Sequence, residues 1–168
     1  MIIFRIRKTP KPSGKSGFTL IEILVTLAIV SILAAVAIPS TQLAVKRNKE
    51  RELRAAVMQI REALDAYKQA AEQGRIARQV GDSGYPPSLD ALTQGLDDKK
   101  SLAGGKLVFL RRIPRDPFYP DTSAPAAATW GRRSYASPAD RPKEGVDVFD
   151  VYSLSPDVGF NDIPYREW

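Results

Sequence analysis

The first pattern along the chain is a long apolar run. Residues 18–38 read FTLIEILVTLAIVSILAAVAI and contain one charged side chain, Glu22. At about 1.5 Å of rise per residue, a helix over this run is about 30 Å long, the thickness of the hydrocarbon core of a bilayer. The run is longer than the apolar core of an ordinary secretory signal, and the helical pattern continues beyond it. We therefore expect a transmembrane helix over residues 18–39, although composition alone leaves open a signal cut within AAVAIPSTQLA.

A narrow apolar stripe follows this run. Its members recur at alternating steps of four and three: Leu53, Val57, Ile60, Leu64, Tyr67 and Ala71. This spacing is typical of one face of an amphipathic helix, and no Gly or Pro occurs between Pro39 and Gly74. We predict a single helix from about Thr19 to Gln73, kinked or loosened near Pro39, whose stripe packs on a soluble domain. Two separate helices remain the alternative.

Beyond Gly74 the chain is broken by proline and glycine, with ten of its 13 prolines at or after Pro86. The segment Pro87-Ser88-Leu89-Asp90-Ala91-Leu92 is predicted to form a short helix that Ser88 caps and that ends near Gly95. Strands are predicted over three segments: Leu107–Leu110, Arg133–Ala136 and Val146–Leu154. The fold class is therefore α+β, with a long N-terminal helix packed on a small antiparallel sheet in a domain of residues 40–168.

The composition excludes several kinds of active site. The 168 residues include no His and no Cys, which removes Ser-His and Cys-His nucleophilic sites, zinc sites built on those ligands and every disulfide. Carboxylate pairs remain, at positions 147 and 150 and at positions 97 and 98. Their spacing fits no acid–base geometry and is typical of solvated side chains. We expect no enzymatic activity.

Positive charge gathers at the N-terminus. The net charge is +6, and five cations precede residue 18 with no acid among them: Arg5, Arg7, Lys8, Lys11 and Lys15. This asymmetry predicts that the N-terminal end of the apolar run is cytoplasmic. Residues 46–54, with five cations and two acids, conflict in part with that topology and are interpreted as a solvated helix face.

Arginines in the C-terminal half are the remaining argument for a nucleic acid partner. They are Arg111, Arg112, Arg115, Arg132 and Arg133, with Trp130 and Tyr135 nearby in the sequence. From residue 18 onward the net charge is only +1, and arginines in loops usually serve surface solvation. No nucleic acid partner is expected.

At the junction of the basic stretch and the apolar run lies KSGFTLIE, residues 15–22. It resembles the prepilin signature shared by type IV pilins and the pseudopilins of type II secretion. That signature has a small residue, an aromatic residue and then a carboxylate four residues later. In that family a membrane aspartyl protease cuts after the glycine and methylates the new amino terminus. The resemblance implies a leader peptide over residues 1–17, cleavage between Gly17 and Phe18, and N-methylation of Phe18.

Glu22 completes this signature and has a physical argument of its own. A carboxylate in hydrocarbon is costly unless it is paired, and cleavage would give Phe18 a positive amine. Pairing of that amine with Glu22 of another subunit, the assembly logic of the family, would neutralise both charges inside a filament. The alternative is a Glu near a helix N-terminus that is stabilised by the helix dipole and reaches to the membrane interface.

The C-terminal half narrows the resemblance. Four segments are similar to segments of the major (G-type) pseudopilins of type II secretion: GYPPSLDAL at 84–92, LRRIPRDPF at 110–118, DVFDVYSLSPD at 147–157, and the closing Asn161-Asp162-Ile163 with Trp168. Typical type IV pilins close this half of the chain with a disulfide. The absence of Cys therefore favours a pseudopilin.

The same resemblance implies a calcium ion in the loop after the last strand. The matching ligands are the Leu154 carbonyl, Asp157 and Asp162. Calcium requires six to eight oxygen ligands, whereas only four residues separate the two aspartates here and Pro156 stiffens the loop. These features favour the alternative, in which the loop is closed by packing of Tyr165 and Trp168 against the sheet.

Taken together, the resemblance implies a structural subunit of a periplasmic pseudopilus that drives protein export in type II secretion. Its partners would be further copies in a helical filament, the prepilin peptidase, minor pseudopilins, and an inner-membrane assembly platform with its ATPase. Before assembly the chain would span the inner membrane once, in contact with lipid, with its C-terminal domain in the periplasm. The alternative is a type IV pilin of a surface pilus for motility, adhesion or DNA uptake.

Overall fold

The computed structural model describes residues 17–79, 81–102 and 104–168, without the side chains of residues 36–40. Of the leader expected over residues 1–17, all but Gly17 lies outside the described residues. The chain divides into two compact units, Met1–Leu43 and Ala44–Trp168, each with its own internal contacts.

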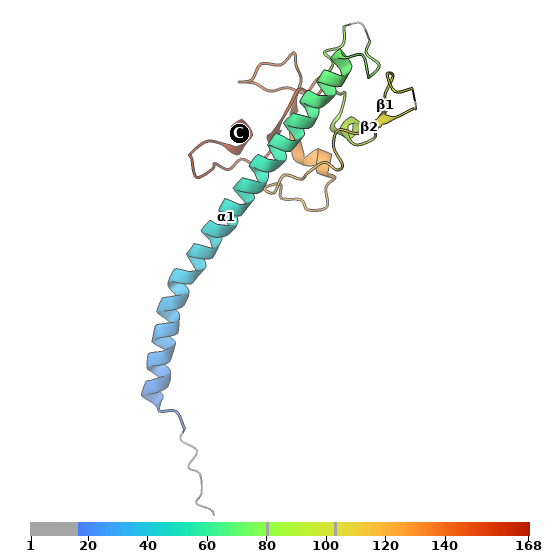
Figure 1. The fold of residues 1–168 in the computed structure, drawn as a ribbon. Coiled ribbons are helices and arrows are strands. Elements are labelled where there is room, and N and C mark those ends of the chain that lie inside the picture. The colour runs from blue at the N-terminus through green and yellow to red at the C-terminus, as the bar shows by residue number, and fades with distance from the viewer. Residues whose placement is uncertain (1–16, 80, 103) are drawn as a thin grey trace, which may run out of the picture. The chain divides into compact units, whose positions relative to one another are not determined.

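One long helix, α1 (Leu20–Glu72), contributes to both units (Figure 1). The predicted helix over Thr19–Gln73 is thereby confirmed to within a residue at each end. Ala, Leu, Glu, Lys and Arg, which are good helix formers, make up most of the segment, and no glycine interrupts it. At its C-terminal end Gly74, with φ of 68°, takes the left-handed conformation that commonly ends a helix.

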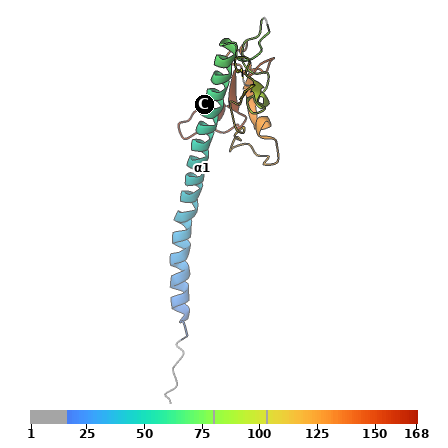
Figure 2. The ribbon, with the colours of Figure 1, turned by 45° about the vertical axis from the view of Figure 1, so that its right-hand side comes forward.

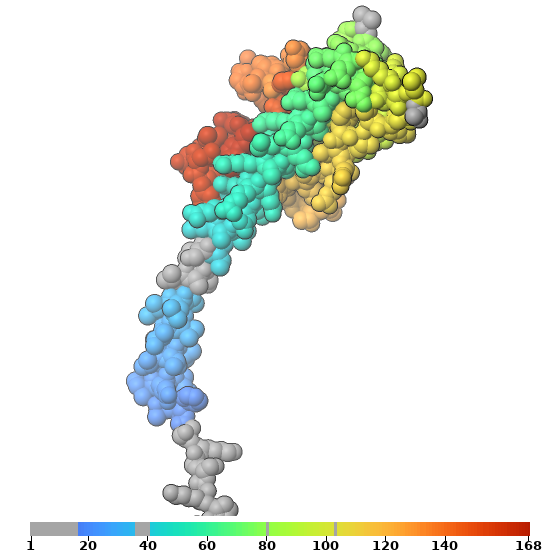
Figure 3. All heavy atoms as spheres, viewed as in Figure 1, coloured from blue at the N-terminus to red at the C-terminus, as the bar shows by residue number. Residues whose placement is uncertain are grey.

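The apolar stripe of α1 forms one wall of the core of the second unit. All six of its predicted members are buried, and Leu53, Ile60 and Leu64 have no exposed surface. The facing wall comes from later in the chain: Leu89, Leu92, Leu110, Trp130, Val148, Val151 and Tyr165. Figure 2 shows the chain after α1 packed beside this part of the helix. In the space-filling view the C-terminal residues, in red, border α1 on one side, and the yellow stretch that includes β1 and β2 borders it on the other (Figure 3).

In the part of the chain that the structure describes, four short strands form two antiparallel pairs. In the first pair, β1 (Leu96–Asp97) meets β2 (Lys106–Leu107), and in the second, β3 (Trp130–Arg133) meets β4 (Asp150–Ser153). Three short 3₁₀ helices accompany them: η1 (Leu89–Leu92), η2 (Ala126–Thr129) and η3 (Tyr165–Glu167). The predicted α+β fold is confirmed, with the sheet divided into two small ladders.

The strand boundaries differ from those predicted because other backbone bonds compete for the same residues. The N–H groups of Phe109 and Leu110 both donate to the Leu92 carbonyl, at 3.1 and 2.9 Å, so the chain turns to η1 after Leu107. Further on, β3 begins three residues before the predicted start and ends at Arg133, because the next N–H, that of Ser134, donates to the Lys143 carbonyl at 2.9 Å.

The last strand is also shorter than the predicted Val146–Leu154. The Val148 N–H donates to the Pro86 carbonyl at 2.8 Å, so this residue pairs with a loop before β4 begins. Ser88 occupies the N-cap position of η1 as predicted, but its side chain makes no capping hydrogen bond. The short segment forms a 3₁₀ turn that is held by burial of Leu89 and Leu92.

Candidate processing and assembly site

The helix that carries the apolar run begins at a threonine cap. The Thr19 carbonyl accepts a hydrogen bond from the Ile23 N–H at 3.2 Å, and Thr19 Oγ1 accepts one from the Glu22 N–H at 3.3 Å. Both bonds are those of an N-cap residue, whose side chain satisfies an N–H that has no partner within the helix. The peptide bond between Gly17 and Phe18 therefore lies outside the helix, in a segment without regular structure.

Gly17 is exposed and has open space around it. A Cβ atom built on it would meet no heavy atom within 4 Å. The fold therefore does not require glycine at this position, and a requirement for it would come from the enzyme that processes the chain. Cleavage after Gly17 and methylation of Phe18 stay predictions.

Glu22 is the third residue of α1, and it is exposed. A carboxylate in the first helical turn is stabilised by the helix dipole. Thr19 and Glu22 also have the spacing of a capping box, of which the structure contains the threonine half. The Glu22 carboxylate has no hydrogen bond or ion pair within the part of the chain that the structure describes. Its pairing with another subunit stays a prediction.

Around Glu22 the surface of α1 is apolar on every side. From Phe18 to Leu33 the large apolar side chains are 49–80% exposed. The hydroxyls of this stretch are satisfied locally, because Thr26 donates to the Ile23 carbonyl at 2.9 Å and Ser31 to the Leu27 carbonyl at 2.7 Å. A helix that is apolar all round needs a cover of lipid or of other protein.

Within the residues whose side chains the structure describes, no helix has both the length and the apolarity that crossing a bilayer needs. The predicted run extends to Ile38, and the side chains of residues 36–38 lie outside that description. The transmembrane assignment stays a prediction.

A second predicted site, the loop after β4, is closed by contacts within the chain. The Tyr165 N–H donates to the Asp157 carbonyl at 3.1 Å, and Val158 and Pro164 form an isolated bridge. Asp162 turns the chain with a φ of 59°, and its N–H donates to the Gly159 carbonyl at 3.1 Å. Tyr165 is 1% exposed and stacks on Phe118, with ring centroids 4.2 Å apart.

These contacts fit a calcium ion poorly. The described residues hold no group of three or more acidic side chains that could bind a metal, and Asp157 and Asp162 are the two carboxylates of this loop. The Asp157 carbonyl already accepts the Tyr165 N–H, and the Val158 carbonyl accepts Lys46 Nζ at 2.9 Å. Leu154 is half exposed. A cage of six to eight oxygens would need several of these groups to be released. The calcium ligands therefore stay a prediction that this geometry does not favour.

Two residues of α1, Glu50 and Arg61, bind the C-terminal segment, and the sequence analysis did not identify them. Glu50 is 7% exposed, and its Oε1 accepts the Phe160 N–H at 3.0 Å and the Tyr165 hydroxyl at 2.9 Å. Arg61 donates to the Trp168 carbonyl at 2.9 Å and pairs with Asp150 at 2.8 Å. The signal was available, because Glu50 lies three residues before Leu53 and so continues the apolar stripe backward.

Three of the four candidate catalytic carboxylates are bound in structural contacts, and the fourth, Asp97, is exposed. Asp150 pairs with Arg61 and with Arg133, at 2.8 and 3.2 Å, and Asp98 pairs with Arg75 at 2.6 Å. The hydrogen bond from Arg75 holds the pKa of Asp98 below its usual value. The Asp147 carboxylate accepts the Ser134 hydroxyl at 2.5 Å and the Tyr135 N–H at 3.0 Å. Each of these three carboxylates therefore has a structural partner within the described residues.

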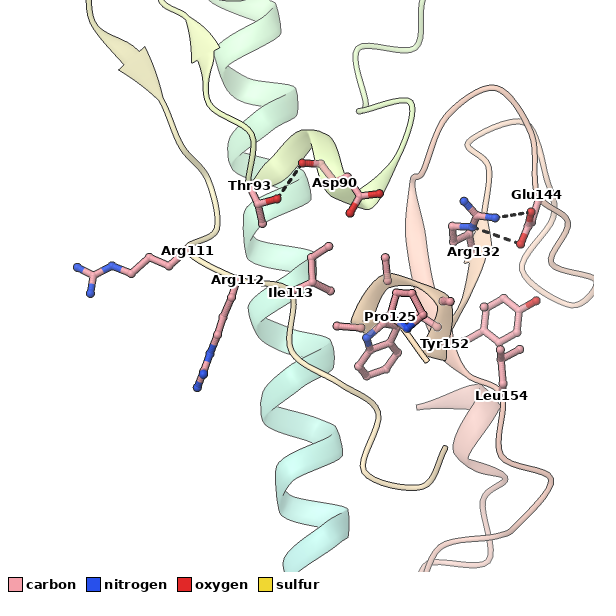
Figure 4. A pocket seen from close by; sticks show the side chains of 15 residues that line it. Asp90, Thr93, Arg111, Arg112, Ile113, Pro125, Arg132, Glu144, Tyr152 and Leu154 are labelled. Carbon is pink, nitrogen blue, oxygen red and sulfur yellow. Dashed lines mark hydrogen bonds and ion pairs between the residues drawn. The ribbon is translucent and has the colours of Figure 1, made fainter. Parts of the chain in front are cut away.

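Three of the five arginines weighed for nucleic acid binding are also engaged. Arg115 donates to the carbonyls of Ala124 and Asp121, Arg132 pairs with Glu144 at 2.8 Å, and Arg133 pairs with Asp150. In the surface pocket of Figure 4, Arg111 and Arg112 point away from the other labelled side chains. The Trp130 ring is buried, and its Nε1–H donates to the Pro114 carbonyl at 2.8 Å, so this ring is not free to stack on a base.

Comparison with known proteins gives one match. A family model described as the prokaryotic N-terminal methylation motif matches residues 12–38, the stretch that contains Gly17, Phe18 and Glu22. It supports a type IV pilin-like subunit in general, with a prepilin leader, and does not separate pilins from pseudopilins. No curated protein and no solved structure matches the chain.

Proposed function

We propose that this chain is a pseudopilin, the structural subunit of a periplasmic filament that drives protein export in type II secretion. Its action is mechanical. Subunits leave the membrane one after another, their apolar helices pack into the core of a filament, and the growing filament pushes cargo toward an outer-membrane channel.

The observation that carries this proposal is a single carboxylate in the first turn of a helix whose apolar side chains are exposed. Glu22 is the only charged residue between positions 18 and 35, and the large apolar side chains around it are about half exposed or more. Such a surface is suited to lipid before assembly and to neighbouring copies afterwards, which are the two environments of a filament subunit. The match to the methylation motif over the same residues supports this role.

The choice of a pseudopilin over a type IV pilin rests on the C-terminal half. The segments at 84–92, 110–118 and 147–157 are similar to those of major pseudopilins, and the chain has no Cys with which to form the disulfide of a typical pilin. In the second of these segments Asp116 is 2% exposed and accepts the Ser153 hydroxyl at 2.5 Å and the Phe118 N–H at 2.8 Å. That motif therefore has a structural role in fixing the turn to β4.

The proposal implies three parts of the chain: a leader over 1–17 that is removed, a membrane and assembly helix over 18–39, and a periplasmic domain over 40–168. The chain would lie in the inner membrane with a cytoplasmic N-terminus. Its partners would be the prepilin peptidase, other copies of itself, minor pseudopilins and the ATPase-driven assembly platform.

Processing is tested by mass analysis of the N-terminus of the membrane-extracted chain, expressed with a prepilin peptidase. We expect a mature chain that begins at methylated Phe18. Gly17→Leu should block cleavage without loss of folding, because a side chain at this position meets open space. A mature chain that begins at Ser40 or later would refute both the anchor and the filament role.

Assembly is tested with variants that separate the charge of Glu22 from its place in the helix cap. Glu22→Gln removes the charge and keeps a side chain suited to a capping box, whereas Thr19→Ala removes the cap and keeps the charge. We expect Glu22→Gln to abolish filaments in electron micrographs and Thr19→Ala to retain them. Ser31→Ala, which changes another polar residue of the same run, is the matched control and should assemble normally. Long surface fibres in place of short periplasmic filaments would favour the pilin.

A further inference from the structure

Four cations of the basic segment of α1, between positions 46 and 54, lie over aromatic rings. Lys46 Nζ is 4.8 Å from the centroid of the Phe160 ring, and Arg47 Cζ is 5.6 Å from the same centroid. Lys49 Nζ lies 5.7 Å from the Phe118 centroid, and Arg54 Cζ lies 4.3 Å from the Trp168 ring. The basic segment of α1 is thus interleaved with aromatic side chains brought to it by later parts of the chain. We call these four cations and three rings the cation–aromatic face.

The acid within this segment does not offset its positive charge at the surface. Glu50 is buried, and its Oε1 accepts hydrogen bonds from the Phe160 N–H and the Tyr165 hydroxyl. Arg47, Lys49, Arg51 and Arg54 are exposed beside it, with Glu52 as the one exposed acid between positions 46 and 54. The surface is therefore more basic than the sequence of the segment suggests.

Apolar side chains are exposed next to these cations. Val158, Phe160 and Ile163 are 46, 44 and 43% exposed, although they belong to a loop that is closed by its own contacts. Lys46 fixes the loop to α1 through the Val158 carbonyl at 2.9 Å. Hydrogen bonds therefore fix the backbone of the loop, while these three side chains stay exposed.

The position of Lys46 in the chain limits where this surface can be. It follows Ile38, the end of the apolar run, by eight residues, so it lies at most about 28 Å from the end of the run in any arrangement of the two units. If the run spans a bilayer, as the proposed function requires, the cation–aromatic face is within reach of the headgroups.

We propose that the cation–aromatic face, with the apolar side chains of Val158, Phe160 and Ile163, is a docking surface for anionic phospholipid headgroups. The cations bind lipid phosphates, and the apolar side chains enter the boundary between headgroups and acyl chains. This contact holds the domain at the membrane before assembly, and leaving the membrane breaks it. The ring faces are already covered by cations and two of the apolar groups are aliphatic, so the surface suits lipid better than the stacked bases of a nucleic acid.

The test uses the full chain with one fluorescent label. Because the chain has no Cys, Ile163→Cys gives a single site for a polarity-sensitive dye. The labelled chain is reconstituted into vesicles of phosphatidylcholine alone or of its mixture with phosphatidylglycerol. We expect a blue shift and quenching by a headgroup-proximal lipid quencher in the anionic vesicles, and a loss of both at high salt.

Two matched controls accompany this measurement. Leu102→Cys carries the dye on a wholly exposed side chain. It lies near Lys99, whose N–H donates to the Arg75 carbonyl, about 35 Å along α1 from the loop, and its emission should not respond to anionic lipid. Arg47→Gln with Lys49→Gln, two cations of the cation–aromatic face, should weaken docking by about 30-fold, whereas Arg111→Gln with Arg112→Gln, the same change of charge elsewhere, should leave it unchanged.

The outcomes separate this inference from the function on which it rests. If the chain fails to float with vesicles of either composition, the membrane anchor itself is refuted. If it floats with both but the dye at position 163 stays in water, or responds equally to neutral and anionic lipid, the docking surface alone is refuted. A response of the dye to single-stranded DNA in detergent, without vesicles, would also overturn it and assign the surface to nucleic acid.

Discussion

Three buried carboxylates of the domain accept hydrogen bonds from hydroxyl and backbone N–H groups. They are Glu50, Asp116 and Asp147, and none of them has an ion pair within the described residues. For Asp147, burial alone would raise the pKa, but hydrogen bonds from the Ser134 and Ser83 hydroxyls and the Tyr135 N–H outweigh it and lower the pKa. Hydrogen bonds to charged acceptors are stronger than those between neutral groups, and the lowered pKa of Asp147 makes stability depend on pH.

The lowered pKa of Asp147 in the folded chain decides in which direction stability changes with pH. Its contribution to stability is complete above the unfolded value of about 4 and is lost as the pH falls through the lower folded value. We expect Ser134→Ala to lower the free energy of unfolding by about 1–3 kcal/mol at pH 7, and by less at pH 3. Urea unfolding of the full chain in mild detergent at the two pH values measures this difference.

Ser101→Ala is the control for that measurement. The Ser101 hydroxyl accepts the Gly105 N–H at 3.1 Å and has no carboxylate partner within the described residues. The loss of stability caused by Ser101→Ala should therefore be the same at both pH values. An effect of Ser134→Ala that does not change with pH would contradict a charged Asp147 as its origin.

Among the structural elements, the contact between α1 and the C-terminal segment depends on one buried pair. The Tyr165 hydroxyl donates to the Glu50 carboxylate at 2.9 Å, and burial, followed by this carboxylate, raises the pKa of the tyrosine. Tyr165→Phe removes the donor and leaves the carboxylate buried with the Phe160 N–H. We expect it to lower the free energy of unfolding by about 1.5–3 kcal/mol, as measured by urea unfolding.

Tyr119→Phe provides the comparison. Its hydroxyl makes no hydrogen bond within the part of the chain that the structure describes, so its loss should change stability little. Equal effects of the two substitutions would show that the bond between Tyr165 and Glu50 does not stabilise the domain.

Elements with strong periodicity could be predicted from the sequence, and those defined by tertiary pairing could not. The stripe of α1 fixed which face of the helix is buried, because hydrophobic burial follows a spacing of three and four residues. The strands are only two to four residues long. Their ends depend on bonds such as those from Phe109 and Leu110 to the Leu92 carbonyl, which join residues far apart in the sequence.

The functional residues likewise divide into those that a local sequence pattern predicts and those that depend on a distant partner. Gly17, Phe18 and Glu22 are contiguous with the apolar run, so a local pattern was enough to single them out. Glu50 was interpreted as part of a solvated charged face, because its partners Phe160 and Tyr165 are more than a hundred residues later. A charged residue on the buried face of a helix indicates such a distant partner, and this signal was present in the spacing.

At the scale of the whole molecule, the closing of the C-terminal loop gives a test of metal dependence. Because the loop is held by Tyr165, Val158 and Lys46, we expect the melting temperature of the full chain to be the same with calcium and with chelator. A bound ion would instead add its binding free energy to folding. Because we expect no bound ion, Asp157→Asn should leave the melting curves with calcium and with chelator unchanged.

A calcium-dependent rise in melting temperature that Asp157→Asn removes would contradict this expectation and restore the predicted ligands. It would mean that the contacts of the loop rearrange on binding, so that the Leu154 carbonyl and the Asp157 and Asp162 carboxylates turn toward the ion.

The inward hydrogen bonds of Thr26 and Ser31 have a consequence for mechanics. Since both hydroxyls bond to their own helix, the described part of the apolar run offers neighbouring helices smooth hydrocarbon and one polar group, Glu22. Apolar surfaces of this kind resist separation, because separation would expose them, but they oppose sliding weakly, because hydrophobic contacts have no fixed direction. If Glu22 pairs with a neighbouring subunit, as proposed, a bundle of such helices should yield under tension by sliding, with each subunit held at that one contact, and should lengthen reversibly before it breaks.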